Sequence, residues 1–263
     1  MSQPRPDCVE WNWRFHHESW DTPWSSEDFP ASETEFDHLR KIRQWNIEPW
    51  FMAPRCEATT LLKQEITHRW PWGYTIYRTV YTPESDLHWE AAADAIRANI
   101  FATLDWQLKN GRRQDKHSHR LVREGYRSLV FEDKARFDGA TISQIREHFK
   151  ASVNNEPAPL GNRFRWCLVI DQEALQSFIR HPEPAGTYIQ DEPDAKEKNG
   201  AWVTVVDPDW KATNEYSERF YPGFMRIHLN RLFRLAYNGD VMPMSHMSTD
   251  MDSPEDIPWF NDF

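Results

Sequence analysis

The pattern of hydrophobic and polar positions indicates a strand most clearly in residues 73–82, which read Gly-Tyr-Thr-Ile-Tyr-Arg-Thr-Val-Tyr-Thr. β-branched and aromatic residues fill nearly every position, which is typical of a strand. Successive side chains of a strand point to opposite faces. The two expected faces are Tyr74, Ile76, Arg78 and Val80 on one side and Thr75, Tyr77, Thr79 and Tyr81 on the other.

A spacing of three to four residues between apolar positions predicts the helices. The longest is expected over 86–109, with Ser85 as its N-cap and an apolar stripe that begins at Trp89. A short helix is expected directly after Asp171, which is its expected N-cap. The other helices are expected over 33–46, over 57–69, after the capping box Thr141-Ile-Ser-Gln144, and over 229–237.

Four more strands are expected, at 127–132, 164–170, 201–206 and 223–229. Strands and helices therefore alternate through most of the chain and end in two consecutive strands. This order favours an α+β fold, in which helices pack on a mixed sheet as in a ferredoxin-like sandwich. An open α/β sheet is the alternative.

Six of the 14 tryptophans fall within the first fifty residues, without a helical or strand period. Large rings in an irregular segment usually fix that segment by being buried. Residues 1–31 are therefore expected to form an ordered wrap, and an aromatic-lined ligand groove is the alternative. Residues 32–240 are expected to form a single α+β domain, followed by an acidic, Met-containing tail over 241–263.

The composition predicts a cytosolic protein. Hydrophobic residues make up 39% of the 263, yet no stretch approaches the roughly 18 uncharged apolar residues of a spanning helix. The first residues lack the basic-then-apolar pattern of a secretion signal. The cysteines number three and are widely spaced, which argues against a disulfide scaffold and fits a cytoplasmic location.

The formal net charge of −10 is unevenly distributed. Residues 109–150 carry 11 Lys and Arg against 6 Asp and Glu, whereas both ends of the chain are acidic. An acidic protein is a poor general binder of nucleic acid, so tRNA is not the favoured partner. The basic segment is expected either to pair with the acidic termini or to meet an anionic ligand.

Several sites with recognisable motifs are absent from the sequence. It holds no phosphate-binding loop, no dinucleotide fingerprint and no Gly-x-Ser-x-Gly elbow, so no cofactor is assigned. His117-Ser-His119 would place two imidazoles on one side of an extended chain, but the surrounding Lys and Arg residues oppose a cation. A solvated basic loop is expected there, and no metal site is predicted.

The candidate catalytic residues are acids that follow strands, namely Asp86, Asp171 and Asp207, together with His88 as a general base. If the strands are parallel neighbours, their carboxyl ends share one edge and the three carboxylates converge there. The alternative is structural: Asp171 is a helix cap, Asp207 begins a turn with Pro208, and Asp86 lies in a first helical turn.

Arg78 is the strongest candidate for binding a substrate. Its neighbours on the same strand face are apolar, so its guanidinium must find either an internal carboxylate or a ligand. Tyr77, Tyr81 and Trp89 are the aromatic side chains expected around that ligand.

Tyr74-Thr-Ile-Tyr-Arg-Thr-Val-Tyr81, followed by Ser85-Asp86 and Trp89, resembles a large group of uncharacterised proteins from filamentous fungi. Phe164-Arg-Trp-Cys-Leu-Val-Ile-Asp171 extends the resemblance, which covers about 70–240. Some such fungal families are enzymes of specialised metabolism, including arginine-containing cyclodipeptide synthases that use aminoacyl-tRNA.

Together with the resemblance, the cytosolic character, the abundant pocket-forming aromatic residues and the acids at strand ends favour a cytosolic, transferase- or cyclase-type biosynthetic enzyme without a nucleotide-cofactor motif. Its expected substrate is polar or amino-acid-derived and binds in an aromatic-lined acidic pocket. An aminoacyl-tRNA-dependent cyclodipeptide synthase and a non-catalytic ligand- or protein-binding module are the alternatives.

Overall fold

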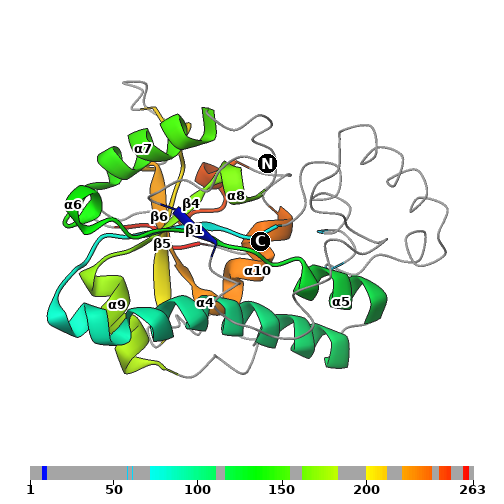
Figure 1. The fold of residues 1–263 in the computed structure, drawn as a ribbon. Helices are drawn as coiled ribbons and strands as arrows, with labels where there is room; N and C mark the ends of the chain where they lie inside the picture. Colours follow the sequence, from blue (N-terminus) through cyan, green and yellow to red (C-terminus); the bar gives the residue numbers. More distant parts are fainter. Residues whose placement is uncertain are drawn as a thin grey trace.

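The computed structural model describes residues 8–10, 58, 61, 72–110, 116–154, 162–182, 200–211, 221–238, 243–249 and 257–260. Within them the chain forms a mixed sheet with helices on both of its faces (Figure 1). The predicted α+β class, a mixed sheet with helices packed on it, is confirmed.

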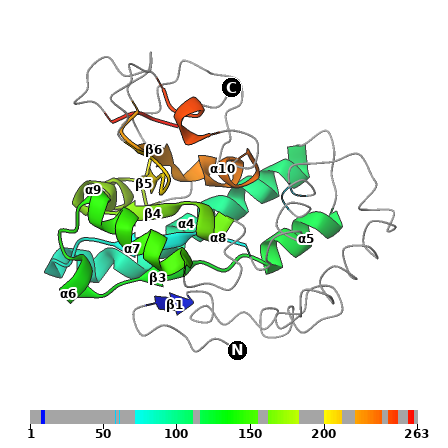
Figure 2. The same cartoon turned by 90° about the horizontal axis from the view of Figure 1, so that it is seen from above.

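The sheet has the strand order β1-β3-β2-β4-β5-β6, which Figure 2 shows from one edge to the other. β2 is parallel to both of its neighbours, β3 and β4. β5 and β6 extend the sheet as antiparallel strands, and β1 pairs antiparallel with β3 at the other edge. The strands are Cys8–Glu10, Thr75–Arg78, Leu129–Phe131, Cys167–Ile170, Trp202–Val206 and Phe224–His228, numbered β1 to β6.

Helical crossovers make the three central strands parallel, since a parallel pair cannot be joined by a tight turn. The first crossover holds α4 (Pro83–Asn110) and α5 (Lys116–Glu124). The second holds α6 (Lys134–Phe137), α7 (Ile142–Asn154) and α8 (Asn162–Arg165). In a ferredoxin-like sheet an antiparallel strand separates the parallel pair of each crossover. Here β2 lies directly between two parallel partners, so within the confirmed class this half of the sheet follows the open α/β alternative.

The remaining helices follow the later strands. α9 (Gln172–Arg180) joins β4 to β5, and the 3₁₀ helix η2 (Leu229–Arg231) leads from β6 into α10 (Leu232–Asn238). The short 3₁₀ helix η3 (Met244–His246) lies in the C-terminal segment. α4 and α9 lie on one side of the sheet, and α6 and α7 on the other (Figure 1).

Each face of the sheet has its own apolar cluster, and the residues of 73–82 divide between the two clusters as predicted. Tyr74, Ile76 and Val80 belong to the larger cluster, under α4, α9 and α10. Tyr77 and Tyr81 belong to the smaller cluster, under α6 and α7. The predicted faces of the strand are therefore confirmed.

Several element boundaries differ from the sequence-based expectation. β2 covers only Thr75–Arg78 of the expected 73–82, and α8 occupies the start of the strand expected over 164–170. The long helix begins at Pro83 and not after Ser85, because Thr82 and Ser85 cap it together: Thr82 N–H donates to Ser85 Oγ at 2.8 Å, and Ser85 N–H to Thr82 Oγ1 at 3.1 Å. The segment read as a basic loop contains α5, in which Val122 is fully buried. The prediction of a solvated basic loop around His117 and His119 is thus wrong, and because both residues lie in α5 they do not have the extended geometry of the metal-pair alternative.

Most of the N-terminal expectations lie outside the described residues. Of the predicted wrap over 1–31, only 8–10 are described, and they pair with β3 at the sheet edge. The helix expected over 33–46 lies outside entirely. Of the helix expected over 57–69, Ala58 and Leu61 are described, and both are helical and fully buried.

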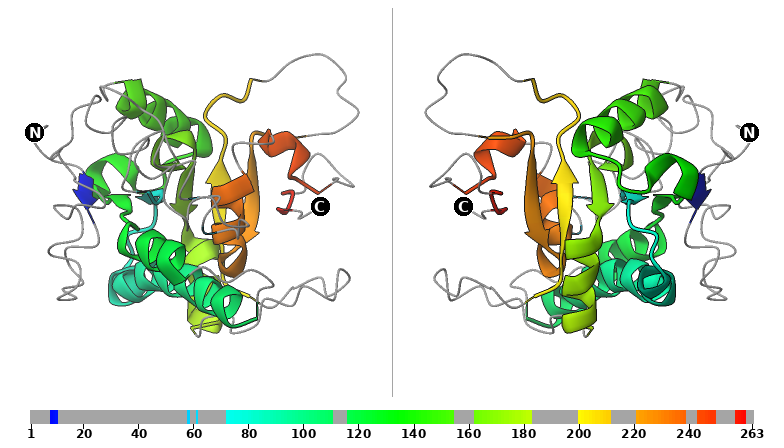
Figure 3. Two further views of the ribbon diagram at one scale, coloured as in Figure 1. Left: turned by 90° about the vertical axis from the view of Figure 1, so that its right-hand side faces the viewer. Right: turned by 90° about the vertical axis from the view of Figure 1, so that its left-hand side faces the viewer.

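The C-terminal segment covers the opposite edge of the sheet. Arg226 N–H of β6 donates to Pro258 O at 2.8 Å, and Phe260 N–H donates to Arg226 O at 2.8 Å. Figure 3 shows β1 and this segment at the two ends of the sheet. None of the helices in the described ranges combines the length and the apolar character needed to cross a bilayer.

Candidate functional site

The carboxyl ends of β2, β3 and β4 lie along the same side of the sheet because these strands are parallel. We call this line of strand ends the carboxyl edge, in contrast to the lateral edges formed by β1 and β6. Arg78 ends β2, Glu132 follows β3 and Asp171 follows β4. Asp207 does not join them, because β5 is antiparallel to β4 and carries its carboxyl end to the opposite edge. The predicted convergence of three aspartates is therefore wrong for Asp207. Strand direction, which decided the outcome, is not visible in the sequence.

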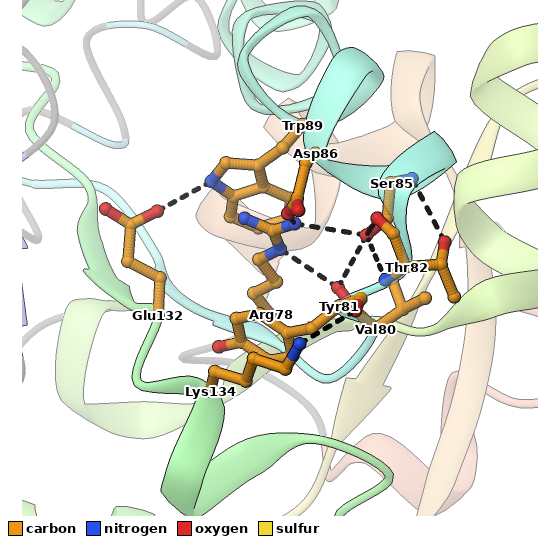
Figure 4. A network of polar contacts seen from close by, with 9 residues as sticks. All are labelled: Arg78, Val80, Tyr81, Thr82, Ser85, Asp86, Trp89, Glu132 and Lys134. Atoms are coloured by element: carbon orange, nitrogen blue, oxygen red, sulfur yellow. Dashed lines mark hydrogen bonds and ion pairs between the residues drawn. The ribbon is translucent and has the colours of Figure 1, made fainter.

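Arg78 is buried at this edge and bonded within the chain. Its Nε donates to Val80 O at 2.9 Å, and its Nη2 donates to Ser85 Oγ at 3.1 Å and to a carboxylate oxygen of Asp86 (Figure 4). The Arg78 side chain is 9% exposed, whereas that of Asp86 is 63% exposed. Of the two expected partners for Arg78, the internal carboxylate is therefore present, and its outer surface faces solvent.

The start of α4 is what brings Asp86 to Arg78. Ser85, fully buried, accepts from Arg78 and from Thr82 N–H, and its own hydroxyl lies within bonding distance of Val80 O and Thr82 O. This fixes the first turn of the helix against the end of β2. Asp86 then follows in that turn, where the N-terminal end of the helix dipole favours a carboxylate.

Two aromatic rings enclose the guanidinium. The Arg78 Cζ lies 4.5 Å from the centroid of the Tyr81 ring and 5.0 Å from that of Trp89, which suits cation–π contact. Trp89 Nε1 donates to Glu132 Oε2 at 2.7 Å and so links α4 to the end of β3. We call Arg78, Tyr81, Asp86, Trp89 and Glu132 the carboxyl-edge site (Figure 4).

The start of α6 adds further charges beside Tyr81. Lys134 Nζ donates to Tyr81 O at 3.4 Å, and Asp133 caps α6 by accepting from Ala135 N–H. Burial raises the pKa of the Tyr81 phenol, and the charges of Glu132, Asp133 and Asp138 raise it further against the opposing effect of Arg78. At neutral pH this hydroxyl is therefore protonated and able to donate a hydrogen bond.

Two of the predicted site residues lie apart from the carboxyl-edge site. Tyr77 points to the opposite face of the sheet, where it is fully buried and its hydroxyl bonds to His148 Nδ1 at 2.8 Å. It cannot share a ligand with Arg78, which corrects that prediction. His88 follows Asp86 by two helical residues, and that spacing turns its side chain roughly 200° around the helix axis from Asp86. Helical geometry does not support their pairing.

Asp171 and Asp207 both have the structural roles that were the alternative to catalysis. Asp171 Oδ1 accepts from Ala174 N–H at 2.8 Å and caps α9. Asp207 Oδ1 accepts from Asp209 N–H at 3.0 Å in a turn, and partial burial raises the pKa of its carboxyl. Only Asp171 shares the edge with Arg78.

The remaining nucleophile and metal candidates carry no site. Cys167 is fully buried in β4, and burial raises the pKa of its thiol, which makes it unreactive. His119 of α5 is buried. Among the described residues, no three His, Cys, Asp or Glu side chains are grouped so as to hold a metal ion.

The N-terminus of α4 is unsuited to a phosphate group. Phosphate sites at helix N-termini use unpaired backbone N–H groups. In α4, Pro83 has no N–H, those of Ser85 and Asp86 bond to Thr82, and Glu84 and Asp86 add negative charge. This agrees with the absence of nucleotide-binding motifs. The edge is better matched to a ligand that carries a positive group.

Sequence reasoning missed Glu132 and the part that Ser85 plays. Glu132 closes the strand expected over 127–132, so the rule that selected Asp86 and Asp171 applied to it equally. The sequence identifies Ser85 only as a helix cap. Its bond to Arg78 depends on the sharp turn after β2, which the pattern of residues does not reveal.

Comparison of the chain with protein-family models, with curated proteins and with solved structures finds no match.

Proposed function

We propose that the protein is a transferase- or cyclase-type enzyme that acts on a small polar or amino-acid-derived substrate at the carboxyl-edge site. One observation carries the proposal: a buried arginine, an exposed carboxylate and two aromatic rings meet where parallel strands end. Ligands of sheet proteins bind preferentially at this position. The role in fungal specialised metabolism is the part of the proposal that rests on the resemblance, and the cytoplasmic location rests on the few, widely spaced cysteines.

The residues divide the work by their chemistry. The Asp86 carboxylate is the general base or acid, because it is exposed on one side and fixed by Arg78 on the other. Arg78 orients that carboxylate and offers its remaining edge to the substrate. Tyr81 and Trp89 provide apolar walls, and Glu132 holds the Trp89 indole in place.

A non-catalytic ligand-binding module is the second candidate. It is favoured by the fact that Arg78 already has protein partners for its Nε and Nη2 groups, as a purely structural arginine would. In that case the same residues bind a ligand and release it unchanged.

The tRNA-dependent alternative receives less support from the structure. It would use the basic segment 109–150 as a binding face, and neutralised phosphates would make its affinity fall steeply with salt. Several of these bases are engaged within the chain: Arg120 with Glu124, Arg123 with Asp105, Arg127 with Glu124 O, and Arg146 with Asp207 O and Gly223 O. The described partners of these bases are acids in or near the basic segment and backbone carbonyl groups. None of these partners lies in the acidic termini.

Expression of the full chain in a heterologous host, followed by comparative metabolite profiling, tests the enzyme proposal. The wild type is expected to produce at least one new compound that Asp86→Asn abolishes, because asparagine keeps the hydrogen bond to Arg78 but cannot exchange a proton. Asp105→Asn, which changes an exposed acid paired with Arg123 on the far part of α4, is the matched control and should leave the compound in place.

The candidates separate on the outcome. A compound that co-purifies with the wild type without chemical change would favour the binding module. A new compound that persists in Asp86→Asn would overturn the assignment of the site.

A further inference from the structure

Tyr81 carries a buried hydroxyl for which no hydrogen-bond partner exists among the described residues. The side chain is only 9% exposed. Buried polar groups are normally paired, so an orphaned one requires a specific explanation, such as a bound molecule or water. The other potential partners near it, Glu132 and Lys134, are bonded to Trp89 and to the Tyr81 carbonyl.

The hydroxyl lies on the same side of Arg78 as Glu132, and away from the Thr82–Ser85 cap (Figure 4). The centroid of the Tyr81 ring lies 4.5 Å from Arg78 Cζ. Because the phenol remains protonated at neutral pH, the group it needs is an acceptor such as a carboxylate or a carbonyl oxygen.

Arg78 offers a second donor at the same place. Its Nε and Nη2 groups are used by Val80, Ser85 and Asp86, while Nη1 makes no hydrogen bond within the described part of the chain. Guanidinium and hydroxyl donors together match one carboxylate or acyl group.

The surrounding charge favours a cation next to that acceptor. Two bases, Arg78 and Lys134, face four acids, Asp86, Glu132, Asp133 and Asp138, which gives a formal balance of −2. A purely anionic ligand would be repelled by this balance. A zwitterion satisfies both the donors and the acids.

Building on the proposed function, we propose that the carboxyl-edge site binds the α-amino-acid group of its substrate. The carboxylate or acyl oxygen accepts from the Tyr81 hydroxyl and Arg78 Nη1, and the ammonium group lies against Glu132 and Asp86. The rest of the substrate extends from the site toward solvent.

Binding of free L-amino acids to the full chain tests this assignment. Thermal shift and isothermal titration are run with amino acids of each side-chain class and, for the best of them, with its N-acetyl and carboxamide derivatives. At least one free amino acid is expected to bind, and blocking either its ammonium or its carboxylate should weaken binding by about tenfold, as expected for losing one charged hydrogen bond.

Tyr81→Phe is expected to weaken binding of the same amino acid by about tenfold. The melting temperature of the ligand-free protein should stay unchanged or rise, because an unpaired group is removed. Tyr221→Phe is the matched control: its hydroxyl is also buried and orphaned among the described residues, but it lies by the Asp207 edge. It should not change affinity. Glu132→Gln keeps an acceptor for Trp89 and should weaken the binding only of ligands that carry an ammonium group.

Three outcomes count against the proposal, and they separate it from the proposed function. Binding restricted to amines without a carboxylate, or to acids without an amine, and weakened by Tyr81→Phe, would overturn the amino-acid assignment and leave the site intact. Equal loss in Tyr81→Phe and Tyr221→Phe would overturn the role of Tyr81. Binding by none of these probes, together with no Asp86-dependent compound in the expression host, would overturn both.

Discussion

At the scale of single residues, the position of Arg78 shows how one side chain can be both structural and available. A charge buried without partners would be costly, and the turn after β2 supplies three acceptors within eight residues of the chain. The requirement for a partner could be predicted from Ile76 and Val80 on the same face. Which partner it finds could not, because the choice depends on the path of the turn.

Arg78→Lys is expected to lower the free energy of unfolding by about 2 kcal/mol, because lysine cannot make the separate bonds to Val80 O and Ser85 Oγ. Urea unfolding measures the change. Arg97→Lys is the control, since Arg97 pairs with Asp94 on the outer part of α4 and its side chain is 25% exposed. That substitution should change stability by about 0.5 kcal/mol or less. Equal effects in the two variants would mean that the buried contacts of Arg78 contribute nothing.

Asp207 gives a prediction about pH. Burial raises the pKa of its carboxyl in the folded state, so the folded protein binds this proton more tightly than the unfolded chain does. The stability contribution of Asp207 therefore falls as pH rises from the unfolded pKa through the folded one. Asp207→Asn should be more stable than the wild type at neutral pH, and the two should converge in acid.

Urea titrations at neutral and acid pH measure this difference. Glu147→Gln, which changes an exposed acid on α7, is the control and should leave the pH dependence as it is in the wild type. A wild type that is the more stable protein at neutral pH would show that the ionised carboxyl of Asp207 is favourably paired.

At the scale of elements, patterns in the sequence predict most of the strands and helices, because these patterns depend only on residues close together in the chain. The two faces of the strand in 73–82, the Thr141–Gln144 capping box and the Asp171 cap all appear in the structure as expected. α5 was missed because its Lys and Arg residues hide the apolar positions that face the fold, such as Val122.

Strand direction is the property of the elements that the candidate site depends on most. The same pattern, an acid after a strand, occurs at Asp171 and Asp207, yet one lies at the carboxyl edge and the other at the opposite edge. The difference comes from the connections: α6 to α8 carry the chain back to make β4 parallel, whereas β5 returns antiparallel after α9. A short strand carries no local mark of its direction, so the edge that each acid occupies follows only from tertiary structure.

At the scale of the whole molecule, segments from near the two ends of the sequence lie at the two lateral edges of the sheet. β1 pairs with β3, and residues 257–260 lie along β6. Open sheet edges pair readily with other chains, so covering them limits self-association. The Trp-rich start contributes β1 to the sheet, and the acidic tail contributes residues that pair with β6 through an isolated bridge.

Removing residues 257–263 tests the role of the C-terminal cover. The truncation takes away the acceptor of Arg226 N–H and the donor to Arg226 O, and it removes the Trp259 ring that stacks on His228 at 4.6 Å. The melting temperature is expected to fall, and the exposed edge of β6 should pair with a second molecule, giving association that rises with protein concentration in sedimentation experiments. A chain shortened only by residues 261–263 keeps those contacts and should behave as the wild type. If the longer truncation stays monomeric with an unchanged melting temperature, β6 does not depend on this cover, and the tail must be assigned another role.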